Sequence, residues 1–266
     1  MEKQYPLNEL RKEKLDKIIK KIKSAGKNKA YDCVVGLSGG TDSSYLLYSA
    51  VNLGLRPLAV HYDHGWNSSL SVTNIKKLTE KFGVDLYTYV NDWEEIKDLQ
   101  ISFLKASISD ADIVADVGVF GCLHRVASKM KIKYVLNGHS FRNESMIPIN
   151  WTYMDGKYIN SVHKRFGREK LRTYPNFTIT DYIYYSFIKK IQVVPFLNYF
   201  EYDKTKAIKI MEKELGWTYS GGQHHEAYYT HFFQSYLLPT KFNIDKIITE
   251  LSAFIRTGQI TREDSL

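Results

Sequence analysis

Short apolar runs alternate with amphipathic stretches along most of the chain. Five of the apolar runs have the length of buried strands, and they cover residues 32–37, 57–62, 85–90, 133–137 and 192–196. Other segments repeat apolar residues at helical spacing, namely 43–52, 70–81, 93–107, 118–130 and 203–215. Strands and helices that alternate in this way form a parallel sheet with helices on both faces. We therefore predict an α/β fold with a doubly wound, mainly parallel, five-stranded sheet.

The pattern changes at both ends of the alternating region. Residues 1–30 are predicted to form one amphipathic helix, whose lysines lie on its solvated face. Residues 31–215 form the α/β domain, with a long polar and aromatic insertion at 146–191. After Gly216 the alternation stops, and residues 216–266 are predicted to be a helical C-terminal extension.

Composition narrows the class of protein. With 44% hydrophobic and 25% charged residues, the chain has the balance of a soluble globular protein, and its apolar runs are too short to span a bilayer. The N-terminus is too charged for a secretory signal, so we expect a cytoplasmic protein with no membrane partner. The two cysteines, Cys33 and Cys122, cannot build a disulfide framework or a thiolate metal cluster, and both are predicted to lie in the core.

The net charge of +8 predicts an anionic partner, such as nucleic acid, a membrane or a phosphorylated substrate. The basic segment 163–172 has no clear apolar period, so its charges are not explained by the solvated face of a helix. It is the better candidate for an anion site, and arginine pairs well with phosphate. Arg168 and Arg172 are its candidate ligands.

Polar, glycine-containing loops follow three of the predicted strands. They are "SGGTDS" (38–43), "DHGWNSS" (63–69) and "NGHSFRNES" (137–145). In a parallel sheet, ligands bind outside the carboxyl ends of the strands, where such loops gather. The three loops are therefore predicted to form one site.

The loop "SGGTDS" is suited to phosphate. Gly39 and Gly40 let backbone N–H groups approach a phosphate closely, Ser38 and Ser43 can donate hydroxyl hydrogen bonds, and the next helix points its positive end at the group. The loop has no lysine, which excludes a Walker A site. Asp42 can orient the loop by accepting backbone N–H bonds, or it can hold Mg²⁺ that bridges the phosphates. A plain glycine turn capped by Asp42 is the alternative.

This loop, directly after an apolar strand, resembles the signature of the ATP pyrophosphatase (PP-loop) superfamily. The resemblance implies a protein that binds ATP, cleaves it between the α- and β-phosphates and adenylates a carbonyl-type oxygen, after which a nitrogen or sulfur nucleophile displaces AMP. The departing pyrophosphate then lies in the loop, which consists of Ser38, Gly39, Gly40, Thr41, Asp42 and Ser43. Asp42 becomes part of a magnesium pyrophosphate site.

Four stretches together resemble one branch of this superfamily, the N-acetyl sugar amidotransferase family. They are "GLSGGTDSSYLLY", "NGHSFRNES", "GWTYSGGQHHEAYYTHFFQSYLLPTKF" and "SAFIRTGQITRED". The resemblance implies an enzyme of surface polysaccharide biosynthesis that uses ATP, Mg²⁺ and ammonia to convert the acetamido group of a nucleotide-linked N-acetyl sugar into an acetamidino group. It also implies that the ammonia comes from a separate glutaminase with a cyclase-like barrel subunit. Members often carry an N-terminal Cys-x-x-Cys zinc module, which the residues before Asp32 lack, so no metal-stabilised N-terminus is expected.

Candidate residues also lie outside the phosphate loop. Glu144 resembles the acid that holds magnesium together with Asp42, and Gly138 of the same loop is assigned to ATP binding. Lys204, at the start of the helix after the fifth strand, could reach the α- or β-phosphate as a catalytic cation. Asp63 is expected to contact the adenine or ribose. The alternatives are an exposed loop residue for Glu144, a turn residue for Asp63 and a solvated helix end for Lys204.

The C-terminal block offers a further candidate contact. His224 and His225 follow two glycines, and we expect a helix N-terminus there that contacts a phosphate or a sugar hydroxyl. A capped helix start is the alternative. Zinc is disfavoured, because adjacent histidines on a helix point in different directions. Arg168 and Arg172 are expected to bind the phosphates of the sugar nucleotide.

Two other functions compete with the amidotransferase. A tRNA-modifying PP-loop enzyme would suit the basic charge, although thiolation needs an exposed reactive cysteine and Cys33 is predicted to be buried. A non-catalytic module would bind ATP without releasing pyrophosphate. We favour the amidotransferase and do not expect a nucleic-acid partner. Neither Cys33 nor Cys122 is placed to hydrolyse glutamine, so the ammonia has to come from outside the chain.

Overall fold

The computed structural model describes residues 5, 8–144, 151, 153–222 and 225–265. Its centre is a five-stranded sheet in the order β3-β2-β1-β4-β5, in which all neighbouring strands are parallel. The strands are β1 (Cys33–Gly36), β2 (Pro57–Asp63), β3 (Leu86–Val90), β4 (Tyr134–Asn137) and β5 (Gln192–Pro195). The five predicted strands and the predicted α/β fold class are confirmed.

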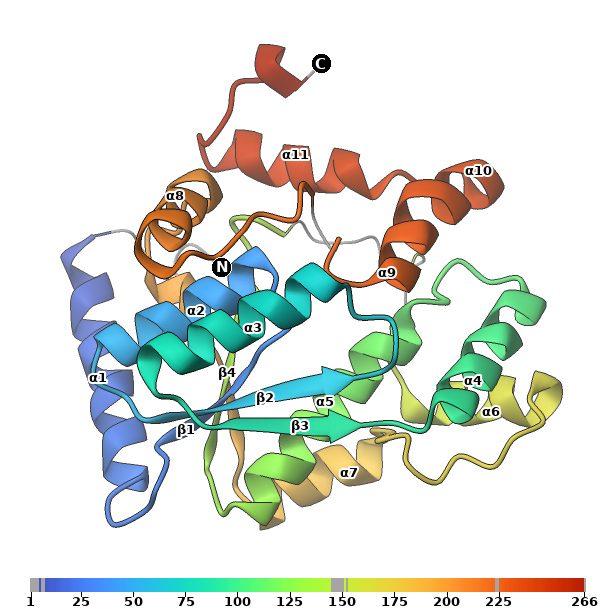
Figure 1. Ribbon diagram of the computed structural model, residues 1–266, viewed down its shortest axis with the longest axis horizontal. Helices are drawn as coiled ribbons and strands as arrows, with labels where there is room; N and C mark the ends of the chain where they lie inside the picture. The colour runs from blue at the N-terminus through green and yellow to red at the C-terminus, as the bar shows by residue number, and fades with distance from the viewer. Residues whose placement is uncertain (1–4, 6–7, 145–150, 152, 223–224, 266) are drawn as a thin grey trace.

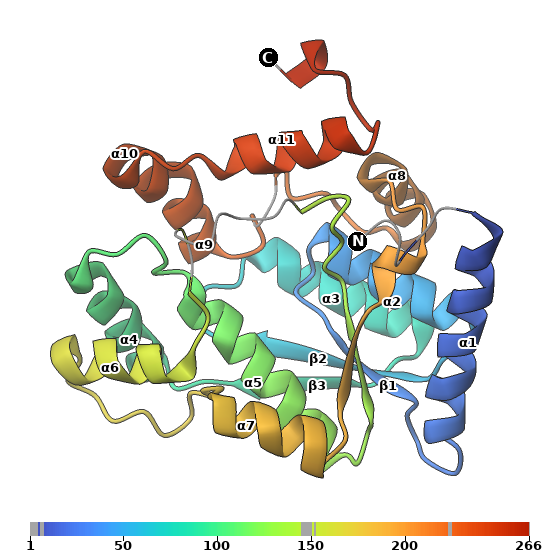
Figure 2. The same ribbon diagram turned by 180° about the vertical axis from the view of Figure 1, so that it is seen from behind.

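Helices cover both faces of the sheet (Figures 1 and 2). One face carries α1 (Glu9–Ala25), α2 (Thr41–Asn52), α3 (Ser69–Phe82) and α8 (Lys204–Leu215), and the other carries α5 (Ile113–Lys129). Alternate residues of a strand point to opposite faces. Val35 of β1 therefore packs in the core under the first group of helices, while its neighbour Val34 packs with Cys122 of α5.

A third hydrophobic cluster lies beyond the carboxyl ends of β2 and β3 (Figure 1). It joins the first residues of α5 to helices from the insertion and from the C-terminal extension. Its other helices are α4 (Trp93–Ala106), α6 (Gly156–Phe166), α9 (Tyr228–Phe232), the π-helical η4 (Phe233–Leu237) and α10 (Leu238–Phe242). The remaining elements are α7 (Ile179–Ile183), the π-helical η2 (Tyr184–Ile188), the 3₁₀ turns η3 (Phe196–Tyr199) and η5 (Glu263–Ser265), and α11 (Lys246–Arg256).

Local sequence sets most helix boundaries. Asp92 caps α4 by accepting from the N–H of Glu94 at 2.9 Å, and Gly216 ends α8 in the left-handed conformation. Two boundaries differ clearly from the prediction: α5 begins at Ile113 rather than at residue 118, and the N-terminal helix α1 ends at Ala25 rather than at residue 30. The first turns of α5 pack into the third cluster, and the sequence period does not reveal that contact.

The C-terminal extension folds back onto the loop after β2. The N–H of Ser68 donates to the carbonyl of Glu226 at 2.9 Å, and the N–H of Tyr228 donates to the carbonyl of Trp66 at 2.9 Å. Helix α11 then lies above both α8 and α9 (Figures 1 and 2). Among the described residues, none of the helices combines the length and the apolar character that a bilayer crossing requires.

We predict that Glu95 of α4 is essential for holding the insertion. Its buried carboxylate accepts from the N–H groups of Thr173 at 2.8 Å and Tyr174 at 3.1 Å. Glu95→Ala leaves these donors unsatisfied and should lower the free energy of unfolding by about 2–4 kcal/mol, measured by urea denaturation. The matched control Glu94→Ala removes a 61% exposed side chain from the same turn. It should change that free energy by less than about 0.5 kcal/mol, and equal losses in both variants would contradict the assignment.

Candidate functional site

The loop between β1 and α2 has a shape that glycine permits. Gly39 has a φ of +82°, and a Cβ there would lie 2.4 Å from the carbonyl oxygen of Ser71. Gly40 is the N-cap of α2, and because it has no Cβ it makes room for the carboxylate of Glu226. Ser38 and Ser43 face each other, with their hydroxyl oxygens 3.0 Å apart, and Ser38 also accepts from the N–H of Gly40 at 3.3 Å. The loop thus brings two hydroxyls and a helix N-terminus together.

The C-terminal extension fixes this loop from the side. The indole of Trp217, 2% exposed, donates to the carbonyl of Gly39 at 3.1 Å. The side-chain amide of Asn74 also donates to that carbonyl at 3.3 Å, and it exchanges hydrogen bonds with the backbone of Thr218 at 2.8 and 3.0 Å. The shape of the phosphate loop therefore depends on residues that follow the α/β alternation.

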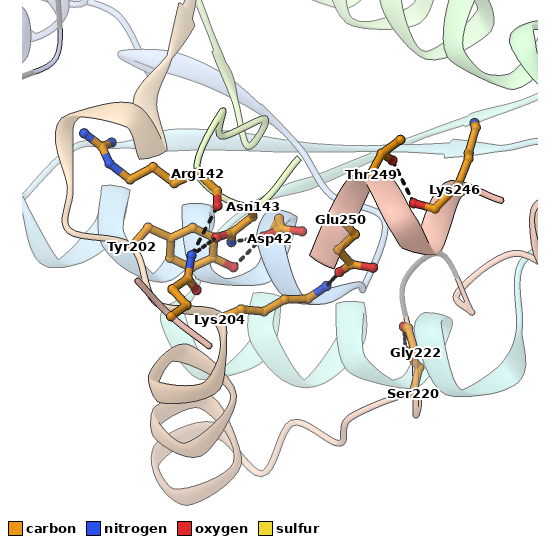
Figure 3. A network of polar contacts seen from close by, with 11 residues as sticks. Asp42, Arg142, Asn143, Tyr202, Lys204, Ser220, Gly222, Lys246, Thr249 and Glu250 are labelled. Carbon is orange, nitrogen blue, oxygen red and sulfur yellow. Dashed lines mark hydrogen bonds and ion pairs between the residues drawn. The ribbon is translucent and has the colours of Figure 1, made fainter. Parts of the chain in front are cut away.

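Asp42 lies among polar side chains at the start of α2 (Figure 3). Its carboxylate accepts from the hydroxyl of Tyr202 at 2.5 Å and from the side-chain amide of Asn143 at 3.5 Å. Burial raises the pKa of Asp42 above 3.8 although Lys204 opposes the shift, and the nearby charge of Glu144 raises it further. The site therefore holds a carboxylate that another cation would stabilise in its ionised form.

Lys204 connects Asp42 to the C-terminal helix α11. Its ammonium donates to the carboxylate of Glu250 at 2.9 Å, and the two side chains are only 11% and 18% exposed. Burial acts to lower the pKa of Lys204, but the charges of Asp42 and Glu250 outweigh it, and the net pKa is raised. Lys204 therefore stays charged between Asp42 of the α/β domain and Glu250 of the C-terminal extension (Figure 3).

The loop after β4 brings the charge of Glu144 near Asp42. Glu144 pairs with the imidazole of His139, and that hydrogen bond raises the pKa of His139. The neighbouring Asn143 accepts from the side-chain amide of Gln259 at 3.1 Å. Arg142 is buried, and its guanidinium donates to the carbonyl of Asn198 at 3.0 Å. This loop, too, is positioned by the last part of the chain.

Glu226 is a charged residue of this site that the sequence reasoning missed. A Cβ on Gly40 would lie 2.8 Å from its carboxylate, and the hydroxyl of Ser38 donates to that carboxylate at 3.5 Å. The sequence places Glu226 directly after the two predicted histidines, but no local period shows that it faces the phosphate loop. The antiparallel bridge between Asn67 and Ala227 puts it there.

The structure groups some of the predicted site residues and separates others. The charges of Lys204 and Glu144 both act on Asp42, and the loop residues Ser38, Gly39, Gly40, Thr41 and Ser43 adjoin it. The backbone of Asp42 lies 3.4 Å from the position that a Cβ on Gly138 would take. Asp63 accepts from the N–H of Gly65 and from the side chain of Asn67, both at 2.9 Å, as the turn alternative requires.

The residues predicted to bind the sugar nucleotide are less closely grouped. The N–H of Arg168 donates to Asp98 of α4 at 2.8 Å, and Arg172 follows on the same exposed segment. The segment leaves the end of α6, which lies on the side of the molecule opposite α8 in both views (Figures 1 and 2). His225 contacts the carbonyl of Ser220 and the ring of His231, whereas His224 lies outside the described residues. The roles of these residues stay predictions.

The carboxylates of Asp42 and Glu144 fit a hard divalent cation only in part. Mg²⁺ takes six oxygen ligands, of which proteins usually supply one or two carboxylates and bound phosphates supply others. The described residues contain no group of three or more His, Cys, Asp or Glu side chains that could hold a metal ion. The donor set therefore suits magnesium that arrives with a phosphate ligand.

Comparisons with known proteins match both parts of the chain. Residues 32–212 match the family model described as queuosine biosynthesis protein QueC. Residues 226–266 match the model described as LPS biosynthesis protein WbpG-like, C-terminal domain.

Individual relatives match more weakly. The tRNA(Ile)-lysidine synthase of Chlamydia pneumoniae is 37% identical over 71 residues, which are 25% of this chain and 22% of that protein. The chain thus spans about a fifth of the length of this curated relative. The NMN synthetase of Francisella tularensis aligns with a TM-score of 0.38 at 18% identity, over 70% of this chain and 88% of that one. The NH3-dependent NAD synthetase of Campylobacter jejuni aligns with a TM-score of 0.37 at 15% identity, over 58% and 72%.

We predict that Asp42→Asn raises the melting temperature of the ligand-free protein. The pKa of Asp42 is raised in the folded state, so its ionised form destabilises the fold above that pKa, and protonation relieves the cost as pH falls. The gain should be about 2–4 °C at mildly alkaline pH and should shrink towards acidic pH, measured by thermal scans over a pH series. Asp92→Asn, which keeps an exposed helix cap, is the control. A melting temperature below that of the unmodified chain at every pH would contradict the assignment.

Proposed function

This chain belongs to the family that the QueC model describes, within the PP-loop ATP pyrophosphatase superfamily, and from this premise we propose that it is an ATP-dependent ligase that forms a carbon–nitrogen bond on a sugar. The acceptor is a nucleotide-linked N-acetyl sugar. Its acetamido group becomes an acetamidino group, and AMP and pyrophosphate are released. The product serves surface polysaccharide biosynthesis.

One observation carries this proposal. The segment that matches the WbpG-like domain supplies two carboxylates to the site, Glu226 beside Gly40 and Glu250 on Lys204. A generic ATP site would need only the phosphate loop and its nearest neighbours. Here the part of the chain that resembles a lipopolysaccharide biosynthesis protein contacts the phosphate loop itself. This contact supports a sugar acceptor of the kind used in polysaccharide biosynthesis.

The proposed reaction has two steps. In the first, the acetamido oxygen attacks the α-phosphorus of ATP, the bond to the bridging oxygen of the β-phosphate breaks, and pyrophosphate leaves. In the second, ammonia attacks the amide carbon, the carbon–oxygen bond breaks, and AMP leaves with that oxygen. Loss of a proton from the added nitrogen gives the neutral or protonated amidine. No oxidant or reductant is needed.

The chain's own residues bind and orient the reacting groups. Backbone N–H groups of the loop and the hydroxyls of Ser38 and Ser43 bind the pyrophosphate. Lys204, held by Glu250, neutralises charge that develops on the α- and β-phosphates. Asp42 and Glu144 would hold magnesium, which when bound screens the charge of the phosphates. Tyr202 fixes the orientation of the Asp42 carboxylate.

The ammonia source lies outside the described site. Cys33 and Cys122 are both buried, and burial raises the pKa of Cys122 to about 12, so neither is a reactive thiolate. We propose that a separate glutaminase with a cyclase-like barrel subunit delivers ammonia to the adenylated acceptor.

A second candidate is a tRNA-modifying enzyme. It is favoured by the 37% identity to a tRNA(Ile)-lysidine synthase and by the net charge of +8. The two candidates differ in their acceptor, so an assay that offers ATP and ammonium with either nucleotide-linked acetamido sugars or tRNA separates them. Turnover with tRNA alone would favour the second candidate.

We predict that ATP is converted to AMP and pyrophosphate only when the acceptor sugar is present. Product analysis by anion-exchange chromatography should show both, and the sugar should lose the mass difference between an oxygen atom and an NH group. Asp42→Asn should reduce turnover by at least ~10²-fold, because it misplaces the reacting phosphate. Asp92→Asn should leave turnover unchanged. Formation of ADP and inorganic phosphate would contradict the proposal.

We also predict that the isolated chain uses ammonium salts but not glutamine. Its rate at a fixed ammonium concentration should rise with pH, because the fraction of free ammonia rises and ammonium is not a nucleophile. Cys122→Ser should show the same rates, since the thiol is buried. Release of glutamate from glutamine by the isolated chain, measured by an enzyme-coupled assay, would refute this prediction.

A further inference from the structure

One outer helix presents an unusual amount of apolar surface. It consists of α7 and the π-helical η2, and six of its ten residues are large apolar side chains that are 43–68% exposed. They are Ile179, Tyr182, Ile183, Tyr184, Phe187 and Ile188. We call this surface, together with Val193 of β5, the α7 face. Monomeric soluble proteins seldom expose contiguous apolar patches of this kind without a binding role.

The α7 face is held rigidly in place. Thr178 and Asp181 form a capping box at the start of the helix. Tyr185 points inward, where its ring stacks on that of Phe177 at 6.0 Å with an interplanar angle of 10°. The N–H of Ile191 donates to the carbonyl of Tyr185 at 2.9 Å, which fixes the turn into β5. The exposed side chains therefore belong to an anchored helix rather than a frayed end.

The apolar surface continues onto the edge of the sheet. β5 is the last strand in the order, so one of its sides has no neighbour within the described sheet. Val194 of this strand packs in the core on the α2 face, so Val193 points to the opposite face, where α7 lies. Exposed strand edges beside apolar surface favour association.

The charges of the helix are complementary to a reversed copy of itself. Asp181 lies near its start, and Lys189 and Lys190 lie at its end. Two such helices packed antiparallel place each acidic end beside the lysines of the other and Ile183 near the centre. An anionic membrane would attract the lysines but repel Asp181. We propose that the α7 face is covered by the α7 face of a second copy of this chain, in a two-fold symmetric dimer.

The size of the α7 face is sufficient for such an interface. The α7 face has three aromatic and four aliphatic side chains that are 37–68% exposed, and each leaves on average roughly 100 Å² uncovered. With their polar rim they approach the ~800 Å² per partner that a standard interface buries. A two-fold interface is isologous, so one patch is enough. The proposal does not rest on the proposed activity, because it involves no residue of the phosphate site.

The first test measures mass in solution. Sedimentation velocity of the full chain over a concentration series should give a species with twice the 30.9 kDa mass of the chain. Ile183→Asp combined with Phe187→Asp should raise the dissociation constant at least ~100-fold, because buried apolar anchors carry most of the binding energy. The control pair Tyr228→Asp and Phe232→Asp alters another exposed apolar surface and should leave the dimer intact.

The second test locates the two-fold axis. Both native cysteines are buried, so Ile183→Cys adds a thiol that oxidised glutathione can convert to a disulfide between copies. A cross-linked dimer should form with Ile183→Cys and not with Tyr236→Cys. A chain that stays monomeric throughout the series, or a dimer that survives Ile183→Asp with Phe187→Asp, would overturn the proposal. So would a monomer that sediments with phosphatidylglycerol vesicles and not with phosphatidylcholine vesicles.

Discussion

The row of charges from Asp42 through Lys204 to Glu250 is the constraint on which the site depends. Burial raises the pKa of Asp42, and the positive charge of Lys204 acts to lower it. Such an arrangement is stable only when each charge has a fixed partner. Glu250 provides that partner for Lys204 at 2.9 Å. Helices α2, α8 and α11 therefore have to meet at one point, although they come from the beginning, the end and the extension of the α/β region.

The C-terminal extension completes the phosphate loop from several sides. Trp217 fixes the carbonyl of Gly39, Glu226 faces Gly40, and Gln259 orients the loop after β4. The α/β domain supplies the proposed phosphate site, and the extension supplies charges and contacts that surround it. This division explains why the two family matches fall on separate segments that nevertheless share one site.

Much of the fold could be predicted from the sequence, because strands and helices leave local periods. That the loop 38–43 and Lys204 lie close together could be predicted, because they follow strands whose carboxyl ends meet at one edge. The pair Lys204–Glu250 and the position of Glu226 could not, since long-range packing sets them and neither has a local signal. For the same reason, the sequence did not reveal the turn bonds of Asp63 or the hydrogen bond from the N–H of Arg168 to Asp98 of α4. The stretch 179–188 lies in the predicted insertion, and its sequence does not show that only Tyr185 packs inward among its large side chains.

The most direct test of the account follows the acetamido oxygen. An acceptor sugar labelled with ¹⁸O in its acetamido carbonyl is incubated with the chain, ATP and ammonium, and the AMP is examined by mass spectrometry. The proposed adenylation moves that oxygen onto the α-phosphorus, so the label should appear in the phosphate of AMP and be absent from the amidine product. Unlabelled AMP, with the label retained in the sugar or released to water, would contradict the central claim.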